Sequence, residues 1–145
     1  MLGAWLLVAL TFFGYRWAAA LSSDPRLSVR GIRLGMTADD VRRRVDEHGP
    51  GEWTSRLDRG DWVLEHDAPT ETSSFELHEG QLVAIRYDAP ADADLGAGPE
   101  FEMTRGSVLT RRIQSGRVRI TLLSRDCPTH HDEAEQLVAA HGTSP

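Results

Sequence analysis

Residues 73–88 read SSFELHEGQLVAIRYD. On both sides of Glu79-Gly80, apolar residues alternate with others: Phe75, Leu77, Val83, Ile85 and Tyr87. Alternation with a period of two is typical of a strand with one buried face, and glycine readily adopts the positive φ of a two-residue hairpin turn. The stretch therefore predicts two antiparallel strands with one apolar face and one face in water.

The same pattern occurs on either side of this hairpin. EWTSRL and DWVLEH flank the turn at 58–60, and SVLTRRI and RVRITLL flank a turn at 114–116. Residues 89–100 between them are rich in Pro, Gly, Ala and Asp, which predicts a loop. The last hairpin is crowded with arginine, either because charge on a solvated face discourages edge pairing or because the face binds an anionic partner: Arg111, Arg112, Arg117 and Arg119.

Helices are predicted before and after these strands. In GIRLGMTADDVRRRVDEHGP, residues 31–50, a short extended entry leads to Thr37 as the N-cap, with Asp40 completing a capping box. A narrow apolar stripe follows, and Gly49 with Pro50 ends the helix. Near the C-terminus, Thr129 is the expected cap of a second helix that ends at Gly142.

We therefore expect an α+β fold in which a helix packs on an antiparallel β-sheet and a C-terminal helix follows. The chain has 145 residues, which is enough for one domain with its own core, placed at 29–145. Residues 22–28, SSDPRLS, are the expected linker to the segment before it. Cys127 is the only cysteine, so no intrachain disulfide is possible.

The N-terminal residues 2–15, LGAWLLVALTFFGY, contain no charged side chain. Continued to Leu21, the run reaches the length of a transmembrane helix if Arg16 extends to the membrane surface. Residues 1–21 are therefore predicted to be a membrane anchor. A cleaved signal segment is the main alternative, because Ala18 and Ala20 form an A-x-A site, and a buried core helix is the third.

The net charge of −6 argues against a general nucleic-acid binder, which needs clustered positive charge. No nucleic-acid partner is therefore expected. Two tryptophans, Trp53 and Trp62, fall on neighbouring predicted strands, where they serve either core packing or a binding surface. With Arg86 and Tyr87 of the next hairpin, they are the candidate partner-binding residues.

The pattern of residues 31–88 resembles the BamE/SmpA-like and β-lactamase-inhibitory-protein-like domains. The similarity lies in Gly-Met-Thr before the first helix, Gly-Pro after it, the tryptophan of DWVLEH, and FELHEGQLVAIRY. It implies a small α+β module of the bacterial envelope that acts through protein contacts without catalysis. It also implies an extracytoplasmic domain, whereas the arginines after residue 15 favour the cytoplasmic side by the positive-inside rule.

One cluster, CPTHHDEAE, could carry chemistry. Cys127 and His130 have C-x-x-H spacing, and His131 lies one helical turn from Glu135, so a metal- or thiol-dependent enzyme is the alternative function. A structural zinc site needs more cysteine or histidine ligands than this cluster has, and the other interpretation is a buried cysteine at a strand-to-helix corner. No cofactor is expected, because no phosphate-binding or dinucleotide motif occurs.

Overall fold

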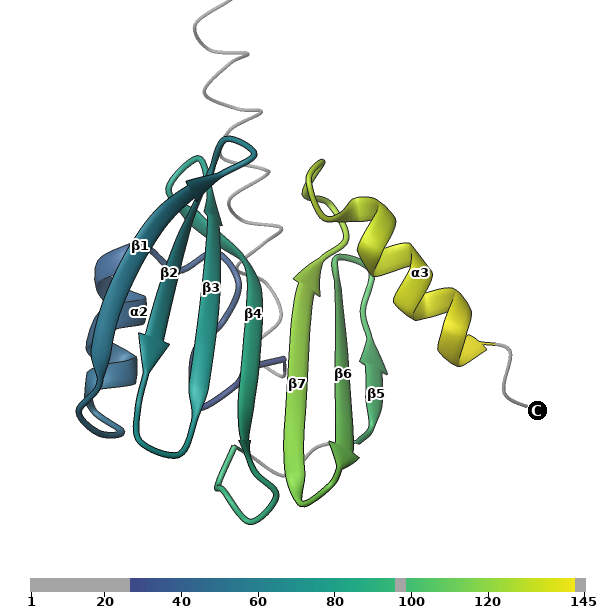
Figure 1. Ribbon diagram of the computed structural model, residues 1–145. Coiled ribbons are helices and arrows are strands. Elements are labelled where there is room, and N and C mark those ends of the chain that lie inside the picture. Colours follow the sequence, from purple (N-terminus) through teal and green to yellow (C-terminus); the bar gives the residue numbers. More distant parts are fainter. Residues whose placement is uncertain (1–26, 96–98, 143–145) are drawn as a thin grey trace, which may run out of the picture.

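The computed structural model describes residues 27–95 and 99–142 (Figure 1). Seven strands form one antiparallel sheet in the order β1-β2-β3-β4-β7-β6-β5. The elements in chain order are α2 (Ala38–Asp46), β1 (Glu52–Asp58), β2 (Asp61–Asp67), β3 (Thr72–His78), β4 (Gln81–Pro90), β5 (Phe101–Met103), β6 (Ser107–Gln114), β7 (Arg117–Ser124) and α3 (His131–Gly142).

The three predicted hairpins are confirmed. Asp58 pairs with Asp61, His78 with Gln81 and Gln114 with Arg117, so each connection has two residues. In each turn both residues have positive φ, for example 52° at Glu79 and 79° at Gly80. This is the turn whose twist matches that of the strands it joins.

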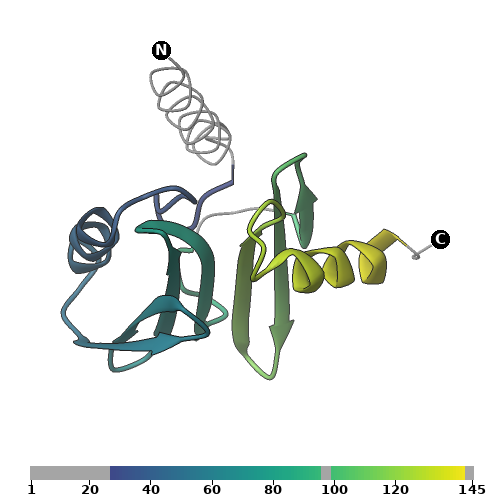
Figure 2. The ribbon, with the colours of Figure 1, turned by 90° about the horizontal axis from the view of Figure 1, so that it is seen from above.

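One face of the sheet carries the main core. Figure 2 shows β1–β4 curling into an arc, with α2 on its inner side. Val41 and Val45 of α2 belong to the same buried cluster as Phe75 and Ile85 of the sheet. Residues 27–36 complete the cover, and their buried members are Leu27, Val29, Ile32 and Leu34.

The opposite face is covered by α3, over β6 and β7 (Figures 1 and 2). Its contact is small, since Ala134 is the buried residue of this helix and packs with Ala84, Val108 and Leu123. His141 stacks on Phe101 of β5, with ring centroids 4.7 Å apart. The two helices therefore lie on different faces of one sheet.

The expected architecture of a helix packed on a sheet is wrong. Strands make up 46% of the described residues and helices 19%, so the sheet dominates the fold. The physical reason is that the sheet curls and supplies much of the core, while α2 has only nine residues. The expectation underestimated how much apolar surface the strands bury on their own inner face.

Several boundaries also differ from the prediction. The expected linker is partly packed, because Leu27 is in the core. The loop predicted at 89–100 begins later, since β4 continues to Pro90 and pairs with β7. Where a strand or an extended entry to the first helix was expected, residues 29–32 form a tight turn with a single bridge between Val29 and Ile32. In α3 the first residue is His131, so Thr129 lies too early to be the residue that precedes the helix.

Thr37 is the N-cap of α2, as predicted, because its hydroxyl oxygen accepts a hydrogen bond from the backbone N–H of Asp40. The predicted membrane segment, residues 1–21, lies outside the described residues. No helix among the residues that the structure describes is long and apolar enough to span a membrane.

Gly51 packs tightly against β2. A Cβ on this residue would lie 2.2 Å from Nε2 of His66 and 2.7 Å from the carbonyl oxygen of Asp67. His66 is buried and its ring lies 4.7 Å from that of Trp53, so it has little room to move. Only glycine fits here without displacing backbone.

We expect Gly51→Ala to lower the free energy of unfolding by about 1–3 kcal/mol, the usual cost of overpacking. Urea unfolding measures this change. Gly142→Ala is the matched control, because nothing lies within 4 Å of a Cβ at Gly142. Equal stability of the two variants would contradict the close approach at Gly51.

Candidate functional site

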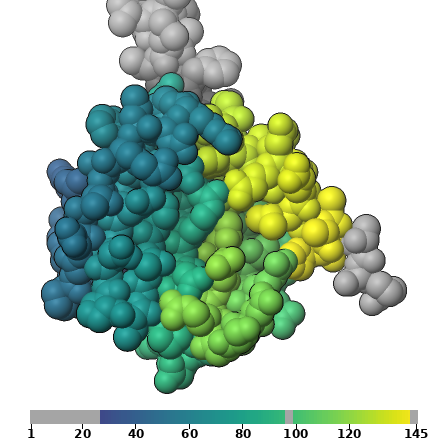
Figure 3. Space-filling model, viewed as in Figure 1, coloured from purple at the N-terminus to yellow at the C-terminus, as the bar shows by residue number. Residues whose placement is uncertain are grey.

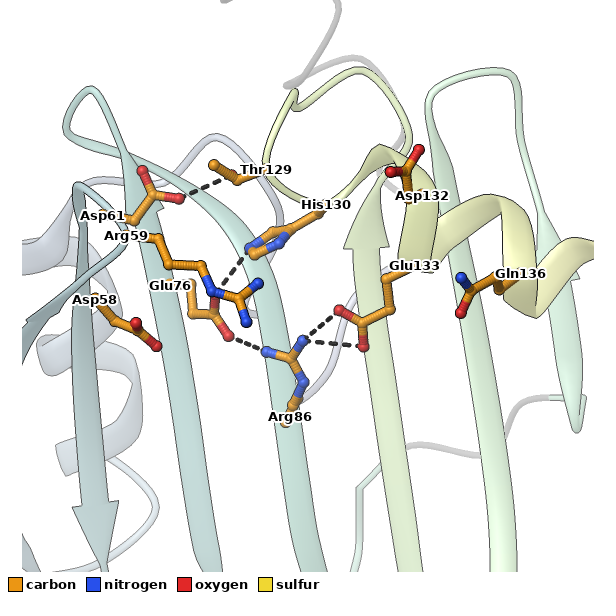
Figure 4. Close-up of a pocket in the computed structure, with 10 residues that line it drawn as sticks. All are labelled: Asp58, Arg59, Asp61, Glu76, Arg86, Thr129, His130, Asp132, Glu133 and Gln136. Carbon is orange, nitrogen blue, oxygen red and sulfur yellow. Dashed lines mark hydrogen bonds and ion pairs between the residues drawn. The ribbon is translucent and has the colours of Figure 1, made fainter.

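A polar cleft of about 410 Å³ lies where the start of α3 meets the tips of β1–β4 (Figure 4). Figure 4 shows side chains from the sheet and from α3 directed toward each other across it. The lining residues are Asp58, Arg59, Asp61, Glu76, Arg86, Thr129, His130, Asp132, Glu133 and Gln136. Five are acidic and two are arginines, so the cleft is predominantly acidic.

Arg86 of β4 links the sheet to α3. Its guanidinium pairs with Glu76 of β3 through Nη1, and its Nη2 lies 2.9 Å from Oε2 and 3.1 Å from Oε1 of Glu133. Glu76 and Arg86 lie on the same face of adjacent strands, since Glu76 pairs with Ala84 two residues from Arg86. One cation thus holds two carboxylates from distant parts of the chain.

His130 is buried at the base of this network, with 6% of its surface exposed. Its Nε2 lies 2.9 Å from Oε2 of Glu76, an ion-pair distance without the alignment of a hydrogen bond. Burial lowers the pKa of the His130 imidazole below its ordinary value of 6.5, and Arg86 lowers it further, while Glu76 and Glu133 oppose the shift. The neutral ring is therefore favoured more than in the unfolded chain.

Asp61 at the start of β2 is the second link between the sheet and the segment before α3. Asp61 is 3% exposed. Its carboxylate accepts a hydrogen bond from the hydroxyl of Thr129 at 2.8 Å and lies 2.6 Å from Nδ1 of His78. Thr129 in turn lies 3.0 Å from Sγ of Cys127. A buried carboxylate needs such partners, so this contact fixes where the segment before α3 lies.

The cysteine and histidine cluster does not come together as a metal site. Cys127 is buried beside Thr129, His130 faces Glu76, and His131 lies 2.8 Å from the carbonyl oxygen of Arg125. Glu135 accepts a hydrogen bond from Arg125 at 2.8 Å. Within the described part of the chain, no group of three or more His, Cys, Asp or Glu residues is placed to hold a metal ion.

The candidate partner-binding residues separate into different environments. Tyr87 is 2% exposed and lies in the core, where burial raises the pKa of its phenol to about 12. Trp53 is partly buried against the core, and its Nε1 donates to Asp46 at 2.9 Å. Arg86 is committed to Glu76 and Glu133. These three residues therefore have structural contacts within the domain.

Trp62 alone of the four is largely exposed, at 56%. It pairs across the first hairpin with Leu57, which is 63% exposed, so the two side chains are neighbours on one face. They lie on β1 and β2 at the edge of the sheet. This exposed apolar pair is the part of the predicted surface that remains open to a partner.

Sequence reasoning missed Leu57, Asp61, Glu76 and Glu133. The signal for Leu57 was available, because a two-residue turn at Arg59-Gly60 fixes the register that sets Leu57 opposite Trp62. No local signal marks Asp61 or Glu76, since their partners Thr129 and His130 lie far along the chain.

Asp61→Ala is expected to lower the free energy of unfolding by about 1–3 kcal/mol, because buried donors lose their acceptor. Asp58→Ala is the matched control, since Asp58 pairs with Asp61 across the same turn but is exposed. Chemical denaturation of both variants measures the difference. A loss no larger than that of the control would show that the buried contact does not hold the segment before α3.

The buried His130 predicts a pH-dependent component of stability. Since its folded pKa is depressed, the unfolded chain binds the proton more readily, so stability falls as the pH drops below 6.5 toward the folded pKa. Unfolding by urea between about pH 7.5 and about pH 5 is expected to show a shallower pH dependence in His130→Gln than in the unaltered chain. His48→Gln, at an exposed histidine, is the control. Parallel profiles of His130→Gln and the unaltered chain would refute this prediction.

Comparisons with known proteins add no relative. No family model matches the chain, and neither a curated protein nor a solved structure matches it. The resemblance of residues 31–88 to the BamE/SmpA-like and β-lactamase-inhibitory-protein-like domains therefore stays a prediction.

Proposed function

We propose that this protein is a non-enzymatic, membrane-attached binding protein, and that an extended segment of another protein adds to its sheet at β1. The observation that carries the proposal is the exposure of β1, an edge strand of seven residues, six of them exposed. An edge strand presents unpaired backbone groups that an extended peptide can pair with.

Three residues of β1 are charged, Glu52, Arg56 and Asp58, but no break in its backbone interrupts the edge. β1 contains no proline, and it pairs with β2 without interruption from Glu52 to Asp58. Among the described residues, its backbone hydrogen bonds run to β2 alone. A regular edge of this kind is a template for another strand.

The hairpin geometry indicates which backbone groups face outward. In a two-residue hairpin, the residues that flank the turn exchange hydrogen bonds with each other, so the backbone of Asp58 points toward β2. By alternation, the N–H and C=O groups of Trp53, Ser55 and Leu57 point away from the sheet. These three residues are the expected contacts of the added strand.

The side chains of β1 indicate the pattern of the partner segment. Leu57 lies beside Trp62 on the inner face, and Arg56 lies on the other face with Asp58 and Glu65. An added strand would therefore place an apolar side chain next to Leu57 and charged side chains next to Arg56. The expected partner segment alternates between apolar and charged residues.

Attachment to a membrane rests on the apolar N-terminal run, residues 2–21. The non-enzymatic part of the proposal is supported by the contacts of Cys127, His130, His131 and Glu135, which are directed to Thr129, Glu76 and Arg125 and do not converge on one point. The structure brings together no nucleophile and base among them in an accessible position, since Cys127 is fully buried.

The test compares Ser55→Pro with Ser55→Ala in the full chain. Proline removes the outward N–H of an exposed residue but leaves the bonds to β2, whereas alanine leaves the N–H in place. Copurification from detergent-solubilised membranes of the native host is expected to recover one stoichiometric partner with the unaltered chain and with Ser55→Ala, and to lose it with Ser55→Pro. Circular dichroism confirms that both variants fold.

Hydrogen exchange of the recovered complex locates the contact. The amides of Trp53, Ser55 and Leu57 are expected to exchange rapidly in the free protein and to become protected in the complex. Retention of the partner by Ser55→Pro, or protection elsewhere than β1, would contradict strand addition. Recovery of no partner would contradict the binding function itself.

A further inference from the structure

The α3 side of the sheet carries a second, differently charged surface at the end away from the polar cleft. Figure 3 shows that α3 leaves the lower part of the green strands uncovered on this side. Here a hollow of about 210 Å³ is lined by Asp88, Arg112, Gln114, Ser115, Arg117 and Arg119, which we call the arginine hollow.

The strand register explains why these residues meet. Arg119 of β7 pairs with Arg112 of β6 on one side and with Asp88 of β4 on the other, so the three form one row across the sheet. Arg117 lies two residues from Arg119 on the same face and pairs with Gln114. The end of the β6–β7 hairpin thus presents three guanidinium groups together.

Internal contacts leave positive charge unbalanced. The carboxylate of Asp88 forms an ion pair with Arg117, and its Oδ2 also lies 2.9 Å from Nη2 of Arg119. One negative charge is therefore shared between two arginines. Arg112 has no carboxylate partner among the described residues, although it lies directly opposite Arg119. Like charges directly opposite each other on adjacent strands are destabilising. The arrangement therefore lacks a counter-charge.

We propose that the arginine hollow binds a phosphate group. Its three guanidiniums and one carboxylate leave a net charge of +2, and a phosphomonoester carries about −1.5 to −2 at pH 7. Guanidinium forks match phosphate oxygens in geometry as well as in charge. The arginines are accessible to a ligand, since 72% of the Arg119 side chain and 46% of the Arg117 side chain are exposed.

The surroundings indicate the kind of phosphate compound. A shallow groove of about 330 Å³ continues from the hollow and shares Asp88 and Arg119 with it. Hydroxyl groups of Thr72, Ser74 and Thr121 line this groove. A polar alcohol esterified to the phosphate would find hydrogen-bond partners there, so a small phosphate ester fits better than free phosphate.

The orientation of Arg117 is fixed from behind. Its Nη2 donates to the carbonyl oxygen of Thr70 at 3.2 Å, while its Nε bonds to Asp88. A side chain held in this way loses less conformational freedom on binding. Arg112 supplies the uncompensated charge, and Arg117 and Arg119 supply preorganised donors.

The test is an NMR titration of the full chain in nonionic detergent, with inorganic phosphate in one arm and glycerol 3-phosphate in the other. Chloride at matched ionic strength is the baseline. The side-chain Nε–H signals of Arg112, Arg117 and Arg119 are expected to shift with both ligands, and glycerol 3-phosphate is expected to bind more tightly. Shifts with inorganic phosphate alone would support phosphate binding in the hollow and would identify the ligand as free phosphate instead of an ester.

Arg112→Gln gives the decisive comparison, because its two expected effects have opposite signs. Phosphate affinity is expected to fall about tenfold through loss of one charged donor. In phosphate-free buffer the midpoint of thermal unfolding is expected to rise, because the repulsion with Arg119 is removed. Arg33→Gln is the matched control, since Arg33 is an exposed arginine outside the hollow.

Absence of shifts in both arms would overturn the proposal, as would equal weakening by Arg112→Gln and Arg33→Gln. Neither outcome bears on the strand-addition function of β1, because β1 is an edge strand and the hollow lies on the interior strands β4, β7 and β6.

Discussion

The burial of one apolar face of the sheet is the constraint on which the rest of the structure depends. Phe75, Ile85 and Leu122 come from three different strands and are fully buried in one cluster with Val41 of α2. Since apolar burial is the main favourable contribution to folding, the sheet must curl around these side chains and recruit residues 27–36 and α2 as a cover. The edge at β1 and the arginine hollow lie outside this core and stay accessible to solvent.

The second face is stabilised in a different way. Its apolar patch is small, and polar contacts locate α3: Glu133 is bound by Arg86, His130 faces Glu76, and Thr129 donates to Asp61. Paired charges that are partly withdrawn from water add little net stability. The cleft is therefore best understood as the joint that positions α3, and the surfaces available to ligands lie to either side of it.

Local patterns predicted local structure well. The three hairpins follow from alternation around turns such as Glu79-Gly80, and the start of α2 follows from Thr37 and Asp40. The pairing of β4 with β7 has no local signal, because a loop and two strands intervene, yet it creates the row of Arg112, Arg119 and Asp88. Which aromatic residues are buried could not be predicted from local patterns either. Tyr87 and Trp62 are both aromatic strand residues, but the cover over the inner face buries Tyr87 and leaves Trp62 exposed.

The contact of Asp61 with Thr129 joins residues 68 positions apart, and this has a consequence for synthesis on the ribosome. The β1–β2 hairpin leaves the exit tunnel long before Thr129, so the Oδ2 atom of Asp61 stays in water until that residue follows. A charged group without its partner resists burial. This rim of the sheet should therefore stay hydrated until Thr129 has left the tunnel and can donate to Asp61.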